Sequence, residues 1–118
     1  MALTVHITNL EKIQEISPEQ PWMAFEDEEL LDYLYPFLAA LKINFGKEID
    51  PYGSVILKTP TEIEFLDGLI AEAQKSLEAK PHQFEKIDRD QSIQFLKNLR
   101  LFFRRALHEK KSLFFIGD

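Results

Sequence analysis

The segment TPTEIEFLDGLIAEAQKSLEAKP constrains the fold more than any other, because it carries both the start and the stop signals of a helix. Thr59 is a suitable N-cap, Pro60 occupies the first helical position, and Glu62 completes a capping box. Apolar residues then recur every three or four positions as far as Leu77, before a proline ends the segment. The pattern predicts an amphipathic helix over residues 60–80, whose apolar side must be covered by other elements.

Two more segments have the same helical spacing of apolar residues. Residues 89–110 form the more strongly amphipathic of the two, with Asp88 or Asp90 as the N-cap. Residues 27–44 form the other, and they contain Pro36. A proline inside a helix removes a hydrogen bond and clashes with the preceding turn, so a kink or a break is expected there.

Short stretches at residues 3–8, 54–58 and 113–116 have strand-like composition, and a short helix is expected over 10–16. We therefore predict a mainly α, compact bundle of three long helices plus a short N-terminal helix. A small sheet is added if the terminal segments pair, and the alternative class is α+β. The 118 residues are expected to form a single globular domain, 1–118.

Charge is distributed unevenly along the chain, whose formal net charge is −6. From Glu11 to Asp32 there are eight acids and one base, and from Lys97 to Lys111 there are six bases and one acid. Either the two segments face each other and partly neutralise, or an acidic face stays open for a basic partner. The net charge itself disfavours general binding of nucleic acid.

Several kinds of chemistry have no support in the sequence. There is no cysteine, the three histidines stand far apart, and the four glycines form no phosphate-binding loop. No serine lies in a nucleophile elbow. We expect no enzymatic activity, no cofactor and no metal. No secretion leader or membrane-spanning run is visible, so a soluble, cytoplasmic protein without membrane contact is expected.

The segment PWMAFEDEELLDYLYPF contains four consecutive acids at residues 26–29. A helix points neighbouring side chains about 100° apart, so the four cannot converge on one ion, and acids are common in a first helical turn. The sharper hypothesis is a protein-binding surface, in which aromatic rings lie beside carboxylates. The residues predicted to form it are Trp22, Glu28, Glu29, Asp32, Tyr33, Tyr35, Asp50 and Tyr52.

The function expected from these observations is binding of another protein, a basic one. Its most concrete form is an immunity or antitoxin-type inhibitor of a basic toxin such as a nuclease, because the size, acidity and helical pattern are similar in kind to those of bacterial immunity proteins. The alternative is a small structural or regulatory subunit that docks through an apolar helical surface and can form a homodimer.

Overall fold

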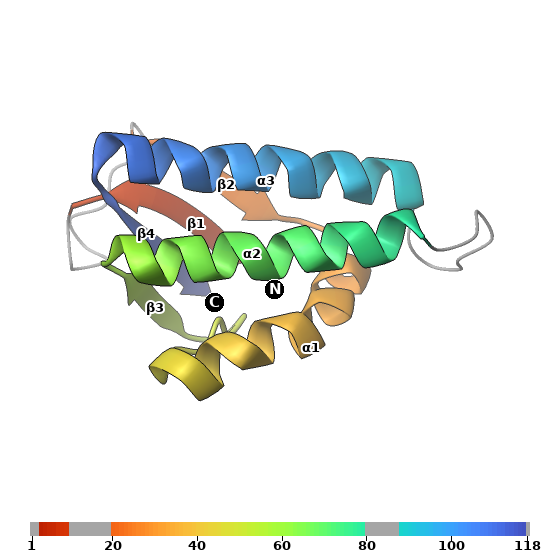
Figure 1. The fold of residues 1–118 in the computed structure, drawn as a ribbon, viewed down its shortest axis with the longest axis horizontal. Helices are drawn as coiled ribbons and strands as arrows, with labels where there is room; N and C mark the ends of the chain where they lie inside the picture. Colours follow the sequence, from red (N-terminus) through yellow and green to blue (C-terminus); the bar gives the residue numbers. More distant parts are fainter. Residues whose placement is uncertain (1–2, 10–19, 80–87, 118) are drawn as a thin grey trace.

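The computed structural model describes residues 3–9, 20–79 and 88–117. They form four strands and three helices (Figure 1). In chain order these are β1 (Leu3–Thr8), β2 (Trp22–Phe25), α1 (Glu28–Phe45), β3 (Ser54–Leu57), α2 (Pro60–Glu78), α3 (Arg89–Glu109) and β4 (Ser112–Gly117). The short helix expected over residues 10–16 falls outside the described residues.

The four strands form one antiparallel sheet in the order β2-β1-β4-β3. Its two central strands are the terminal segments, with Val5 opposite Phe115 and Ile7 opposite Leu113. The terminal segments do pair, which is the condition that the sequence left open for a small sheet. β2 and β3 add an edge strand on either side.

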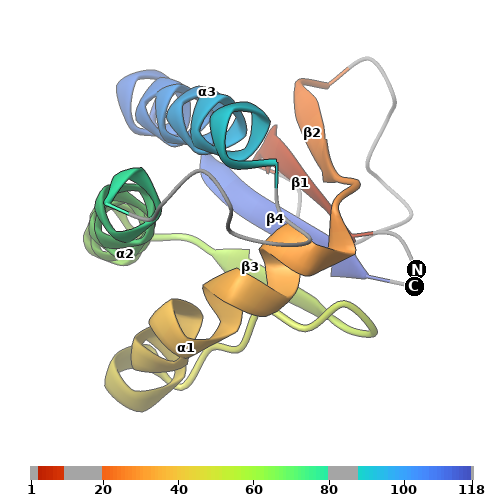
Figure 2. The ribbon, with the colours of Figure 1, turned by 90° about the vertical axis from the view of Figure 1, so that its right-hand side faces the viewer.

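The helices form a layer over the sheet, with α2 between α1 and α3 (Figure 2). Alternate residues of the central strands face this layer, including Val5 and Phe115, which are fully buried. They share one core with Leu34 of α1, Leu66 of α2 and Phe103 of α3. Helices and sheet are thus held by the same apolar interior.

The prediction of a helical bundle is confirmed only in part. The chain has the three long helices, at 18, 19 and 21 residues, and they start and end within two residues of the expected positions. Their apolar sides, however, are covered jointly by one another and by the sheet. The description α+β is the better one, because four strands take part in the core.

Strand β2 was not expected from the sequence, because its four residues, WMAF, are too few to show a clear alternation of apolar and polar residues. Met23 and Phe25 nevertheless face the core, while Trp22 and Ala24 face the other side of the sheet. Pairing with β1 places these residues in the sheet, and that pairing is a long-range feature.

Helix α1 continues through Pro36, so a break, one of the two outcomes expected there, is excluded. Pro36 and Asp32 are both exposed, so water can reach the carbonyl of Asp32, which the proline leaves without a donor. Asp27 caps the start of the helix by accepting hydrogen bonds from the N–H groups of Glu29 and Leu30. Gly46 ends it in the left-handed conformation, with φ of 67°.

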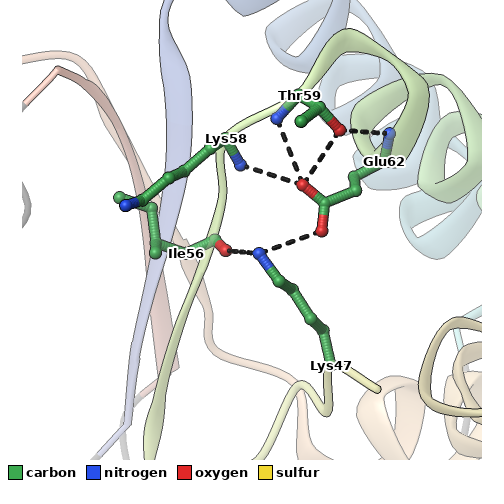
Figure 3. Close-up of polar contacts among 5 residues, drawn as sticks. All are labelled: Lys47, Ile56, Lys58, Thr59 and Glu62. Atoms are coloured by element: carbon green, nitrogen blue, oxygen red, sulfur yellow. Dashed lines mark hydrogen bonds and ion pairs between the residues drawn. The ribbon is translucent and has the colours of Figure 1, made fainter. Parts of the chain in front are cut away.

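The start of α2 is tied to β3 by a nearly buried carboxylate, that of Glu62, which is 6% exposed (Figure 3). The predicted capping box is present, with Thr59 as N-cap. Glu62 also accepts a bond from the N–H of Lys58 and forms an ion pair of 2.9 Å with Lys47. The Lys47 ammonium donates in turn to the carbonyl of Ile56, so the network joins the loop after α1, β3 and α2.

Candidate functional site

The exposed side of α1 carries acids and one tyrosine in helical register. Glu28, Asp32 and Tyr35 follow one another at spacings of four and three residues, and all three are exposed. Glu29 lies beside them and is exposed as well. The sequence pattern therefore correctly placed these side chains on the solvent side of the helix.

The loop between α1 and β3 brings two more of the predicted residues to this side. Asp50 accepts a hydrogen bond of 2.8 Å from the backbone N–H of Tyr52, which forms a local turn. The loop is anchored to the end of β4, where the N–H of Gly117 donates to the carbonyl of Gly53. A Cβ at Gly117 would lie 2.3 Å from the carbonyl oxygen of Pro51, so only glycine allows this close approach.

The phenol of Tyr35 interacts electrostatically with groups of both the helix and the loop. Partial burial raises the pKa of Tyr35, and Asp50 and Asp32 raise it further, followed by Tyr52 and Glu48. These groups are therefore electrostatic neighbours. We call Asp32, Tyr35, Glu48, Asp50 and Tyr52 the acidic tyrosine patch.

Glu48 was not among the predicted residues, although it belongs to this patch. Its carboxylate also pairs with Lys42 at 3.2 Å, and both side chains are largely exposed. Its position two residues before Asp50, in a turn-rich loop, was a usable sequence signal for including it in the predicted surface. Only the fold of the loop brings it near α1.

Two predicted residues lie elsewhere. The hydroxyl of Tyr33 donates a hydrogen bond of 2.7 Å to Ser76 of α2, so this ring joins two helices. Trp22 is on the sheet face that points away from the helices, where its ring stacks on His6 at 6.3 Å. The structure thus brings together Asp32, Tyr35, Asp50 and Tyr52, with Glu28 and Glu29 further along α1.

The possibility that the acidic and basic segments neutralise each other finds no support in the described residues. There, no ion pair joins residues 20–32 to residues 97–111, and the acids at positions 11, 15 and 19 lie outside the described residues. Two bases of α3 pair with other acids instead: Arg100 with Asp67 of α2 at 3.1 Å and Arg105 with Glu109 of the same helix at 2.6 Å. Glu28, Glu29 and Asp32 are exposed, and no described basic residue forms an ion pair with their carboxylates.

Other kinds of site find no geometric support in the described residues. There, no three acidic or histidine side chains are grouped so that they could bind a metal ion. No helix among residues 3–9, 20–79 and 88–117 combines the length and apolarity needed to cross a membrane. Comparison of the chain with protein-family models, with curated proteins and with solved structures found no match.

Proposed function

We propose that this chain is a non-catalytic domain that binds a basic protein through the exposed side of α1 and the acidic tyrosine patch. The observation that carries the proposal is that Glu28, Asp32 and Tyr35 share the exposed side of α1, where Asp50 and Asp32 also raise the pKa of Tyr35. Tyrosine rings supply contact area at low entropic cost, and unpaired carboxylates attract a cationic partner over a distance. Tyr52, which is 72% exposed, offers a second ring at the same place.

The most concrete form of this function is inhibition of a cationic toxin. An enzyme that cleaves nucleic acid needs a positively charged surface to receive phosphates. A small acidic domain can cover that surface by placing its carboxylates where the phosphates of the nucleic acid would bind. An immunity or antitoxin-type protein would act in this way. Long-range attraction would make association fast, as an inhibitor of a toxin requires.

The proposal is tested by capturing the partner from native cell extract with two variants of equal charge. One variant carries Glu28→Gln and Asp32→Asn, on the proposed surface. The control carries Glu64→Gln and Glu72→Gln, two exposed acids of α2. The first variant should lose about tenfold in affinity, equivalent to about 1.4 kcal/mol, and the control should retain it. Equal retention by both variants would rule out the proposed surface.

Salt provides a second readout of the same proposal. Surface charges are screened beyond roughly 8 Å at physiological ionic strength, so the association rate should fall steeply as salt is added. The salt dependence should be weaker for the variant with changed α1 acids than for the control. A rate that does not respond to salt would contradict the role of these carboxylates.

One observation favours a second candidate, a small structural or regulatory subunit, but one that docks through the sheet and not through the apolar helical surface expected from the sequence. A row of side chains crosses the sheet face that points away from the helices: Trp22, His6, Phe114 and Ile56 lie opposite one another on the four strands. Trp22 is the exposed member of this row, whereas Phe114 is buried. Burial lowers the pKa of His6, which favours an uncharged row at neutral pH. A homodimer formed through this face would appear in light scattering as a concentration-dependent mass that is insensitive to salt.

A further inference from the structure

A cavity of about 240 Å³ lies where β2 ends and where α1 and α3 begin. These ends of the three elements face the viewer in Figure 2. Its buried lining residues are Phe25, Leu30 and Ser92, and Phe95 is half-buried. The exposed residues that line it are Glu26, Asp27 and Gln91. The cavity thus has a mostly apolar interior and a polar mouth, which is the usual character of a ligand pocket.

Ser92 gives the cavity an unusual feature. The residue is only 2% exposed, and its hydroxyl has no hydrogen-bond partner among the described residues. A buried hydroxyl without a partner reduces stability, so alanine would be the better residue if the position served the fold alone. The hydroxyl is therefore a candidate contact for a group that enters the cavity.

The charges at the mouth determine which group can enter. Two helix starts meet here, which by itself would favour an anion. However, Asp27 already accepts from the N–H groups at the start of α1, and Asp88 accepts from that of Gln91 at the start of α3. With Glu26 beside them, the mouth carries an excess of negative charge, so an anion is repelled and a cation is attracted.

We infer that this cavity receives the guanidinium group of an arginine from the protein partner. A guanidinium is planar, weakly hydrated and rich in donors, so it can bind several acceptors while it packs against an aromatic ring. Here the acceptors are the carboxylates of Glu26 and Asp27 and the hydroxyl of Ser92, and the ring is that of Phe95. The volume corresponds to about eight water molecules at roughly 30 Å³ each, which is similar to an arginine side chain.

The cavity and the proposed surface both adjoin the start of α1 but lie on different sides of it. Asp27 at the mouth and Asp32 are separated by about 8 Å along the helix, at 1.5 Å per residue, and by about 140° around its axis. A basic partner would therefore have to pass around the start of α1 to place one arginine in the cavity and others beside Asp32 and Tyr35. That a protein partner supplies the arginine rests on the proposed function, whereas the binding of a guanidinium group by the cavity does not.

The test uses a small probe, N-acetyl-arginine amide, added to the full chain and followed by NMR of the backbone amides. Saturable shifts are expected at Gln91, Ser92 and Phe95, with a dissociation constant in the millimolar range for so small a ligand. The matched probe is N-acetyl-citrulline amide, which has nearly the same shape without the charge. It should bind at least about fivefold more weakly, because the carboxylates at the mouth no longer attract it.

Two substitutions with a control complete the experiment. Ser92→Ala and Glu26→Gln should each lower the affinity for the arginine probe by about threefold, whereas Glu64→Gln on α2 should leave that affinity unchanged. Ser92→Ala should not lower the urea midpoint, since it removes an unpaired buried hydroxyl. Absence of saturable shifts at these amides, or equal binding of the two probes, would overturn the inference. Such a result would leave the capture experiment on the α1 acids unaffected.

Discussion

The carboxylate of Glu62 offers the sharpest test of how this fold is held together. It accepts four bonds, from the Lys47 ammonium at 2.9 Å, the Thr59 hydroxyl at 3.0 Å, the Thr59 N–H at 3.1 Å and the Lys58 N–H at 3.2 Å. Glu62→Gln keeps the shape and one acceptor oxygen, but it turns an amide NH₂ toward the ammonium. The loss is thus concentrated on the contact with Lys47.

The structure sets the size of the expected effect. Breaking a fully buried ion pair costs about 3–5 kcal/mol, because one charge is left without water or partner. The Lys47 side chain is 28% exposed and keeps its bond to the carbonyl of Ile56, so water can compensate it in part. We therefore expect Glu62→Gln to lower the free energy of unfolding by about 2 kcal/mol.

Urea denaturation of Glu62→Gln, of Lys47→Met and of the double variant checks the effect of Glu62→Gln and shows how much of it depends on Lys47. The coupling free energy between the two positions should be about 1 kcal/mol. Far-UV circular dichroism and the fluorescence of Trp22 would follow unfolding independently. A coupling within the usual error of additivity, about 0.3 kcal/mol, would show that the pair contributes nothing beyond its separate members.

The same carboxyl group also predicts how stability depends on pH. Burial acts to raise the pKa of Glu62, but the hydrogen bonds from Lys47 and Thr59 outweigh it, and the pKa lies below its ordinary value of 4.5. The unfolded chain therefore takes up this proton first. The stabilisation is complete above pH 4.5 and is lost as the pH falls through the folded value. Glu62→Gln should remove that part of the acid dependence.

Three further substitutions probe the helix contacts and the loop that carries the patch. Tyr33→Phe removes the bond to Ser76 and should lower the free energy of unfolding by about 1 kcal/mol, measured by urea denaturation; no change would mean that water replaces the bond. Gly117→Ala should cost about 2 kcal/mol or more, because a Cβ meets the carbonyl of Pro51, and it should also weaken partner capture by displacing the loop. Gly46→Ala should cost about 1 kcal/mol in thermal unfolding through its left-handed backbone alone, with partner capture retained.

The predicted site shows what can be recognised in the sequence and what cannot. Helical spacing was enough to place Glu28, Asp32 and Tyr35 on one exposed side, because it is a local property of α1. The same spacing also placed Tyr33 on the apolar side, three positions after Leu30, so it was a usable signal against including Tyr33 in the site; its hydroxyl is in fact bound by another helix. Trp22 was expected on the same surface, but pairing of β2 with β1 places it on the far face of the sheet.

The sequence by itself determined the three helices, since their caps, apolar stripes and stops are local signals that act within a few turns. The capping box at Thr59 and Glu62 is the clearest case, for both residues act as predicted. Only the tertiary structure decided what covers those helices, because strand pairing joins residues more than a hundred positions apart, such as Leu3 and Gly117. That pairing forms the centre of the sheet. The loop, which is hydrogen-bonded to Gly117, then brings Asp50 and Tyr52 close enough to Tyr35 to raise its pKa.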